Sequence, residues 1–230
     1  MSVDFRLYLI TDRKIAAKPL PEAVRLALQG GVKAVQLREK DLPVRELLAL
    51  AQELRAITRE FGAKLFINDR VDVAVAVGAD GVHLGHQSMP PEAVRKAAGK
   101  GLLIGVSTHN PEEAKAAEAG GADFITFGPI FQTPSKSEYG VPVGIDALKA
   151  LKNEVKIPIF ALGGIKSGNF EQIIMSGASG MAMISAILAA PDIKEAAAIF
   201  VQAATVLNRP VCPDCSPRQD WVLPGSNEAR

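Results

Sequence analysis

The 230-residue sequence predicts a single α/β domain folded as a (β/α)8 barrel, or TIM barrel. Two observations support this fold class. Eight short apolar runs occur at regular intervals, and each is followed by a segment with apolar residues at helical spacing. We expect the barrel to span residues 1–208, with 209–230 as a short, disordered C-terminal extension rich in Pro, Ser and charge. An open, doubly wound sheet is the alternative, but evenly spaced units without a second-domain boundary favour the barrel.

Strands are expected where apolar runs follow turn signals. In chain order the expected strands are 6–11, 34–37, 64–67, 81–84, 103–106, 124–127, 157–162 and 180–184. Several are introduced by a similar phrase, as in Gly78-Ala79-Asp80 and Gly121-Ala122-Asp123. Glycine just beyond a helix supplies the left-handed conformation that ends it, and the apolar run then begins a strand.

Helix starts are marked by proline, as at Pro43, Pro90 and Pro111. The clearest apolar face follows the second strand, where the residues at helical spacing are Leu47, Leu48, Ala51, Leu54 and Ile57. Because each helix returns the chain to the same end of the barrel, the carboxyl ends of all strands meet at the other end. Functional side chains are therefore expected after each strand.

The composition limits the partners and the cellular location that we expect for this protein. Lys plus Arg (26) nearly cancels Asp plus Glu (25), so neither a nucleic acid nor a membrane surface is an expected partner. No run of about 18 apolar residues occurs, and the first residues lack a signal segment, so we expect a cytoplasmic protein. The two cysteines, Cys212 and Cys215, provide half of a four-ligand zinc site. An inert tail motif, a zinc shared between chains and a redox pair remain open for them.

The segment after the second strand carries cations. Strand alternation would place Gln36, Arg38 and Lys40 on one side and Leu37 with Glu39 on the other. Two cations and an amide converging inside a barrel mouth would be costly to desolvate without an anion to bind. An exposed loop with salt bridges is the alternative reading.

Further polar residues follow the third and sixth strands. Asn68 and Asp69 end the third strand, and Asp69 is either an ion-pair partner or a Mg²⁺ ligand. A Gly/Pro-broken loop after the sixth strand carries Thr133, Ser135 and Lys136, which we expect beside an anionic ligand unless the loop is only solvated.

A phosphate cup is expected after the last two strands. Gly163 and Gly164 would let the backbone approach an anion, while Ile184 and Ser185 precede a helix start. With the cations on the other side of the mouth, two anionic subsites are predicted. They suggest two phosphorylated reactants, or one reactant and a departing diphosphate.

Several motifs in order resemble the thiamine phosphate synthase and thiazole tautomerase superfamily, over about residues 6–190. They are QLREK at 36–40, INDRVDVA at 67–74, GVHLG at 81–85, GVSTH at 105–109, GPIF at 128–131 with a following Thr and Ser-Lys, and GGI at 163–165. In the synthases, the resemblance implies, a hydroxymethylpyrimidine diphosphate loses its diphosphate. The resulting cation is captured by the nitrogen of a thiazole phosphate.

The resemblance also implies roles for individual residues. The diphosphate substrate would be held by Gln36, Arg38, Lys40, Asn68 and Lys136, with Ser107 near the pyrimidine. The thiazole phosphate would meet Thr133, Ser135, Gly163, Gly164, Ile184 and Ser185. The residues assigned to catalysis are Lys136, Arg38, His109 and Ser107, with Asp69 holding Mg²⁺. The expected partners are small phosphorylated substrates, and a homodimer is expected from the family.

One departure leaves the choice between synthase and tautomerase open. Synthases usually carry a second Mg²⁺-binding aspartate after the HLG motif, where this chain has Ser88, and a glutamine where it has His86. A tautomerase acting on a thiazole carboxylate phosphate needs a general acid or base instead of a metal, and His109 is the candidate. The simpler role for His109 is a backbone contact beside a helix start. His83, inside a strand, is expected to be a core histidine.

Overall fold

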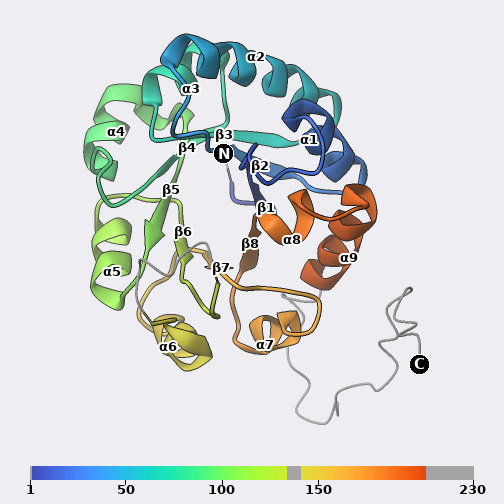
Figure 1. Ribbon diagram of the computed structural model, residues 1–230. Helices are drawn as coiled ribbons and strands as arrows, with labels where there is room; N and C mark the ends of the chain where they lie inside the picture. Colours follow the sequence, from blue (N-terminus) through green and yellow to red (C-terminus); the bar gives the residue numbers. More distant parts are fainter. Residues whose placement is uncertain (1, 134–140, 206–230) are drawn as a thin grey trace, which may run out of the picture.

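The computed structural model describes residues 2–133 and 141–205, which form a closed barrel of eight parallel strands in sequential order. Figure 1 looks along the barrel, with the strands in the centre and most helices around them. The strands are β1 (Leu7–Ile10), β2 (Ala34–Leu37), β3 (Lys64–Asn68), β4 (Gly81–Leu84), β5 (Leu103–Thr108), β6 (Phe124–Phe127), β7 (Ile159–Leu162) and β8 (Gly180–Met183). The predicted fold class is therefore confirmed.

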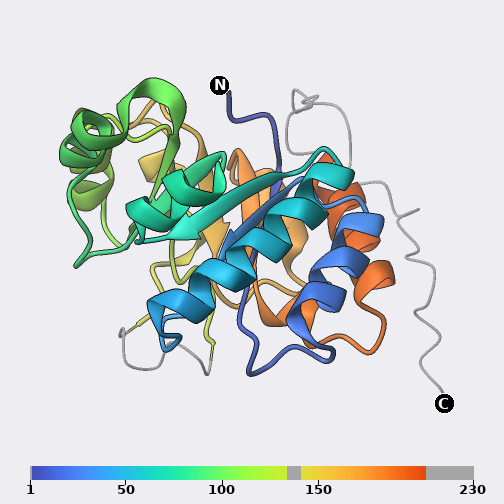
Figure 2. The ribbon, with the colours of Figure 1, turned by 90° about the horizontal axis from the view of Figure 1, so that it is seen from above.

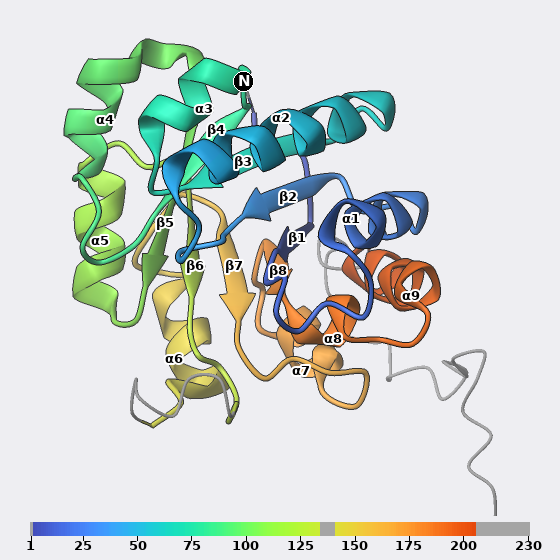
Figure 3. The same cartoon turned by 45° about the horizontal axis from the view of Figure 1, so that its top comes forward.

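A helix follows every strand. The helices are α1 (Leu20–Gln29), α2 (Val44–Glu60), α3 (Val71–Val77), α4 (Pro91–Ala98), α5 (Pro111–Ala119), α6 (Gly144–Leu151), α7 (Phe170–Met175), α8 (Ser185–Leu188) and α9 (Ile193–Thr205), with a 3-10 turn η1 (Gly99–Gly101). The tilted view in Figure 3 shows that α8 lies close to the end of β8, inside the outer ring of helices. The short helix thus comes near the end of the barrel where the strands finish.

Most strand boundaries agree with the sequence prediction within two residues. The largest difference on the amino side is at β7, which begins at Ile159 instead of residue 157. Pro158 lacks a backbone N–H and cannot donate to the ladder, although its carbonyl oxygen accepts a hydrogen bond from the Ile125 amide at 3.0 Å. The amide of Ile157 is bonded to the Glu118 carboxylate instead.

The inside of the barrel is filled mainly by aromatic rings. Five of them form one cluster: Phe5, Tyr8, Phe66, Phe124 and Phe160. Three glycines make room for the rings, each on a strand next to the one that carries the ring, because a Cβ at Gly81, Gly105 or Gly180 would approach a phenylalanine ring within 2.4–2.8 Å. The larger apolar core lies between the strands and the helices. A layer of rings thus separates the two open ends of the barrel.

The residue that precedes a strand repeats one contact at the amino end of the barrel. The Asp80 carboxylate accepts from the Leu65 amide at 2.8 Å, and the Asp123 carboxylate accepts from the Ile104 amide at 2.7 Å. Ser179 does the same weakly for Ile159, at 3.3 Å. In each pair a strand of even number, β4, β6 or β8, is tied to the strand before it. The glycine-containing phrase of the sequence therefore encodes a repeated clamp.

The N-terminus lies at the clamp end of the barrel. Figure 2 shows it on the opposite side of the molecule from the segment that joins β1 to α1. No helix in the described residues is long and apolar enough to cross a membrane. The carboxyl ends of the strands consequently form the other end, called the mouth below.

Candidate active site

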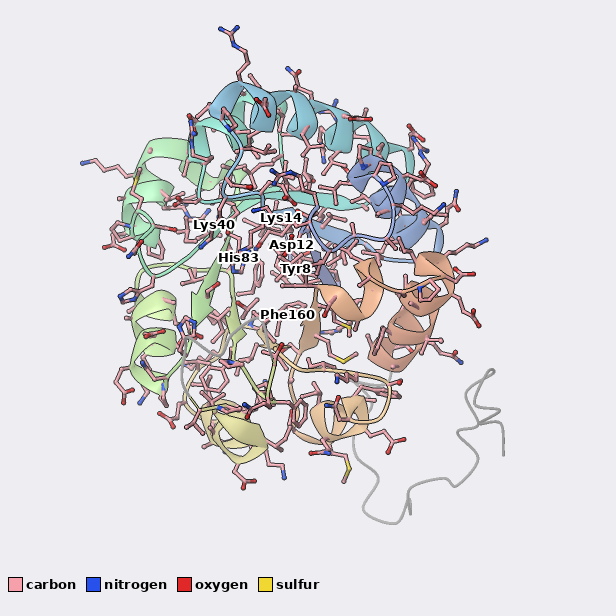
Figure 4. The ribbon with its side chains drawn as sticks, in the orientation of Figure 1. Tyr8, Asp12, Lys14, Lys40, His83 and Phe160 are labelled. Atoms are coloured by element: carbon pink, nitrogen blue, oxygen red, sulfur yellow. The ribbon has the colours of Figure 1, made fainter. Side chains whose placement is uncertain are left out.

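A chain of polar side chains crosses the interior just below the mouth. The amide of Gln36 donates to the Tyr8 hydroxyl at 3.2 Å, and this hydroxyl lies 3.4 Å from Nδ1 of His83. On the other side of the imidazole, Nε2 lies 3.0 Å from the Ser107 hydroxyl and 3.5 Å from that of Thr126. Figure 4 shows Tyr8 and His83 close together inside the ring of strands. Five strands thus contribute to one continuous polar layer.

The burial of Tyr8 sets the direction of the hydrogen bonds in this layer. Tyr8 is fully buried, which raises its pKa well above the usual value for a phenol and keeps the hydroxyl protonated. With Gln36 donating to that hydroxyl, the phenolic proton can be donated to Nδ1 of His83. The imidazole proton then lies on Nε2 and can be donated to Ser107. His83 is therefore a buried, hydrogen-bonded histidine, as expected from the sequence, and it joins two predicted substrate-binding residues.

The segment after β2 is held by a second network. Thr11 donates its hydroxyl hydrogen to Glu39 at 2.7 Å, while the Arg38 amide donates to the Thr11 oxygen at 2.8 Å. The guanidinium of Arg13 bridges Glu39 at 3.1 Å and Asp41 at 2.6 Å. This bridging raises the pKa of Arg13 and, through the same bonds, lowers that of Asp41 far below its usual range. The ends of β1 and β2 are thereby tied together.

Arg38 and Lys40 differ from the cations of this network. Within residues 2–133 and 141–205, neither side chain has a carboxylate within ion-pair distance. Strand β2 ends at Leu37, so alternation does not extend to Lys40, which lies exposed in the following turn. Figure 4 nevertheless shows Lys40 near the centre of the mouth, beside the labelled Lys14 and Asp12. Arg38 is half-buried.

Asn68 and Asp69 stand where β3 ends. Asn68 is opposite His83 in the strand register, which places it at the level of the interior polar layer. Asp69 is exposed and has a φ of +64°, while its amide donates to the His83 carbonyl at 2.9 Å. Left-handed backbone is uncommon for a residue other than glycine, although Asp and Asn tolerate it best. The turn projects the Asp69 carboxylate from the strand end into solvent.

Ser88 has a local structural role. Its hydroxyl accepts a hydrogen bond from the Gly85 amide at 2.7 Å, and the Ser88 amide donates to the Gly85 carbonyl at 3.1 Å. These two bonds close the turn that follows β4. The described residues contain no group of three or more His, Cys, Asp or Glu that could enclose a metal ion. The Mg²⁺ role expected for Asp69 from the sequence stays a prediction.

The two glycines after β7 pack against the segment that follows β6. A Cβ at Gly163 would lie 2.7 Å from Pro129, and one at Gly164 would lie 2.7 Å from the Gln132 carbonyl and the Phe131 Cβ. Both glycines also have positive φ, +99° and +66°. The glycines are thus needed for loop packing, a reason that the sequence argument about phosphate approach did not include.

The structure describes only some of the other residues predicted for this side of the mouth. Thr133 is half-buried at the end of the described segment, whereas Ser135 and Lys136 lie outside the described residues. Ile184 precedes α8, and its carbonyl accepts from the Leu188 amide at 3.0 Å. Ser185 is exposed at the first position of that helix. The β8 end therefore presents the start of a helix at the mouth, as predicted.

His109 is fixed at the start of α5. Its amide and Nδ1 both contact Oε2 of Glu113, at 2.8 and 3.0 Å. Asn110 caps the helix by accepting from the Glu113 amide and donating to the other Glu113 oxygen. This arrangement is the helix-start role considered in the sequence analysis, with a carboxylate in addition to backbone.

Some members of the two networks were not predicted from the sequence. Tyr8, Thr11, Glu39 and Thr126 were not among the predicted site residues, although all four are buried. For three of them the available signal was a polar residue within or just after an apolar strand. Glu39 could be placed on the side away from its neighbours, but its partners could not be inferred because they depend on the pairing of β1 with β2.

Comparison with known proteins places this site in a family. Residues 7–187 match the family model described as thiamine monophosphate synthase. A protein of Geobacter sulfurreducens, provisionally named a thiamine-phosphate synthase, is 59% identical over 196 residues, which cover 85% of this chain and 92% of the relative. The thiamine-phosphate synthase of Moorella thermoacetica is 44% identical over 192 residues, covering 83% of this chain and 91% of that protein.

A solved structure gives the same result. The thiamine phosphate pyrophosphorylase of Pyrococcus furiosus superposes with a TM-score of 0.82 at 40% identity, covering 89% of this chain and 98% of that one. The family model spans most of the barrel, and the relatives match over nearly their whole length. The resemblance inferred from the motifs is therefore confirmed, and the chain belongs to the thiamine monophosphate synthase family.

Proposed function

We propose that this protein is a thiamine phosphate synthase, a transferase that joins hydroxymethylpyrimidine diphosphate to thiazole phosphate and releases diphosphate. The relatives that carry this name match the chain over more than four-fifths of its length. The observation that carries the proposal is the mouth itself, where a buried polar layer accompanies two cations that have no carboxylate partner in the part of the chain that the structure describes. Such a site suits a planar heterocycle bearing a diphosphate.

The polar layer is proposed to recognise the pyrimidine. Ser107 is proposed to lie near this ring and Gln36 to help hold the pyrimidine diphosphate, and Tyr8 with His83 connects the two. Because every link is hydrogen-bonded, the donors and acceptors offered to the ring are fixed before it binds. Preorganisation of this kind lowers the barrier by holding the reacting carbon in one position.

The leaving group is proposed to lie above this layer. Arg38, Lys40, Asn68 and Lys136 would neutralise the diphosphate as the bond to the pyrimidine methylene carbon breaks and the electron pair leaves with oxygen. The thiazole nitrogen then donates its lone pair to that carbon, forming the new C–N bond. The protein supplies no nucleophile. Its contribution is electrostatic stabilisation of the departing anion and positioning of the acceptor.

The donors at the end of β3 fit Mg²⁺. Asp69 offers one exposed carboxylate, and Ser88 occupies the position of a second one with its hydroxyl engaged by Gly85. Mg²⁺ keeps several waters and is often held by one or two carboxylates together with substrate phosphates. Bound there, it would neutralise further charge on the diphosphate. Asp69 would hold it, with the rest of the shell from water and the diphosphate oxygens.

The opposite side of the mouth is proposed to bind the thiazole phosphate. Gly163, Gly164, Ile184 and Ser185 would surround its phosphate, with Thr133 and Ser135 from the segment after β6. The close packing of Gly164 against that segment couples the two parts of this subsite. A phosphate here would place the thiazole nitrogen toward the interior polar layer.

The proposal is tested with the purified full-length protein and both phosphorylated substrates, with and without Mg²⁺. Formation of thiamine phosphate that depends on Mg²⁺ is the expected result. The same protein is incubated separately with the thiazole carboxylate phosphate. Metal-independent isomerisation that is lost in His109→Ala, without any condensation product, would replace the synthase by the tautomerase alternative.

Three expectations from the sequence remain proposals. We propose a barrel domain of residues 1–208 with an extension of 209–230, a homodimer, and a cytoplasmic location. Residues 206–230 lie outside the described part of the chain, and so do Cys212 and Cys215. Light scattering of the purified protein would measure the mass of the assembly directly.

A further inference from the structure

We propose that Glu39 is a positioning residue for the diphosphate subsite, acting on Arg38 and Lys40 without contacting the substrate. This inference rests on the proposed function, because it concerns how that subsite is kept ready. Glu39 lies between the two cations in the sequence. Its side chain is directed away from them, toward the end of β1, and only 2% of it is exposed.

Glu39 is bound through both oxygens of its carboxylate. One oxygen accepts from the Thr11 hydroxyl at 2.7 Å and from the Arg13 amide at 3.1 Å. The other accepts from the same amide at 3.2 Å and from the Arg13 guanidinium at 3.1 Å. A buried carboxylate with this many donors is held in a single orientation, because any other orientation would leave it desolvated and unpaired.

Glu39 is linked through Thr11 to the backbone of its neighbour, Arg38. The Thr11 hydroxyl that donates to Glu39 also accepts from the Arg38 amide at 2.8 Å. One hydroxyl therefore joins the carboxylate of residue 39 to the amide of residue 38. This bond comes just beyond the last ladder pair of β1 with β2. It fixes the direction in which the chain leaves the strand, and hence where Arg38 begins.

The same network determines which cations the nearby carboxylates bind. A carboxylate between two cations would ordinarily be a competitor for the anion that they bind. Here Glu39 is committed to Arg13, while Asp41 takes Arg13 and Lys14. Two anions and two cations thus neutralise one another, and Arg38 and Lys40 have no carboxylate partner within the described residues. The network sorts the charges so that the two flanking cations remain available for diphosphate.

The test uses two substitutions that interrupt this link and one control. Thr11→Val replaces the hydroxyl by a methyl of similar size, and Glu39→Gln keeps an acceptor but removes the charge. Glu60→Gln is the control, because it removes the carboxylate of an exposed ion pair with Arg25 that belongs to neither network of the mouth. The measurements are KM for each substrate, calorimetric affinity for inorganic diphosphate with Mg²⁺, and the melting temperature of each variant.

We expect Thr11→Val and Glu39→Gln each to raise KM for the pyrimidine diphosphate at least tenfold and to weaken diphosphate binding similarly. KM for thiazole phosphate should stay within twofold in both, and Glu60→Gln should change neither value by more than twofold. The double variant should be little worse than either single one, because both interrupt the same chain of bonds.

A proportional rise of both KM values, or a lower melting temperature with unchanged diphosphate affinity, would overturn the positioning role and leave a structural brace. The calorimetric measurement does not depend on turnover. If the unaltered protein bound diphosphate but made no thiamine phosphate, the proposed function would fail, while the comparison of variants would still decide the role of Glu39.

Discussion

The two ends of the barrel use polar residues in opposite ways. At the amino end, Asp80 and Asp123 have the same environment, each bound to a backbone amide of the preceding strand and to an arginine, Arg55 or Arg95. At the mouth, the polar contacts differ from one strand to the next. The polar groups there include a neutral buried layer, a closed charge network and two cations without carboxylate partners among the described residues.

The difference separates stability from activity. A repeated contact of a carboxylate with a backbone amide and an arginine strengthens the fold, and the same short phrase can encode it at several places. A left-handed aspartate costs stability and persists only where the surrounding structure fixes it. Changes to the aspartates at the amino end should therefore alter unfolding and leave turnover unchanged, whereas changes to the exposed groups at the mouth should alter turnover and leave unfolding unchanged. The following predictions test this separation, beginning with the largest effect.

Asp69→Asn should lower kcat about 100-fold or more, because the amide cannot supply the carboxylate proposed to hold Mg²⁺. Asparagine tolerates positive φ about as well as aspartate, so the turn after β3 should be retained and the melting temperature should stay within 2 °C. Turnover is measured across a range of Mg²⁺ concentrations. Activity within threefold of the unaltered protein would show that the metal is held elsewhere.

Asp123→Ala should have the reverse effect at the amino end. It leaves the buried Ile104 amide without its acceptor and Arg95 without its carboxylate. Loss of a buried hydrogen-bond partner costs about 1–3 kcal/mol, so the free energy of unfolding should fall by that amount. KM and kcat should remain within twofold.

A control for Asp123→Ala is Asp146→Ala, which removes the fully exposed carboxylate at the start of α6. Urea denaturation should show no more than about 0.5 kcal/mol of change for a surface residue of this kind. If the loss of kcat/KM in Asp123→Ala, expressed as a free energy, exceeded the loss in the free energy of unfolding, the separation of the two ends would be contradicted.

The amino end was more predictable from the sequence than the mouth. The glycine-containing phrases and the apolar runs are local signals, and they located all eight strands. The position of Gln36 inside the barrel also followed from alternation. The bond from Gln36 to Tyr8 did not follow, because it depends on the pairing of β1 with β2, and neither did the contact of Tyr8 with His83, which crosses the interior from β4.

The same limit applies to the glycines after β7. Their sequence position indicated a phosphate subsite, whereas the contacts at Gly164 are with the segment that follows β6. No local pattern contains that information, because the two segments are more than 30 residues apart. The charged residues at the mouth could be identified from the motifs. That Glu39 forms its ion pair with Arg13 could not, because this pairing depends on three-dimensional packing.

Tyr8→Phe tests the buried layer through its pH dependence. The pKa of Tyr8 is raised by burial, so the folded protein keeps a proton that the unfolded chain loses above its usual pKa of 10. The stability contributed by the neutral hydroxyl is therefore fully present below pH 10 and declines as the pH rises further, by roughly 1 kcal/mol within the first unit. The variant lacks this contribution to the slope. Equal slopes for both proteins between pH 9 and pH 11 would contradict the assigned burial.

Ser88→Asp should produce the smallest effect and sharpen the description of the mouth. The Ser88 hydroxyl accepts from the Gly85 amide. An aspartate can keep this bond with one carboxylate oxygen and offer the other to the metal. We expect the Mg²⁺ concentration for half-maximal activity to fall about three- to tenfold, because Mg²⁺ favours one or two carboxylates. kcat should change little, since the diphosphate is already neutralised once the metal is bound.

Ser88→Asn is the matched control for that substitution, because an amide can close the turn in the same way without adding charge. Its Mg²⁺ requirement should equal that of the unaltered protein. If Ser88→Asp and Ser88→Asn behaved alike, the turn after β4 would lie too far from Asp69 to share a metal with it. The single carboxylate at β3 would then be a complete protein contribution to the site, and the serine would carry no cost in metal affinity.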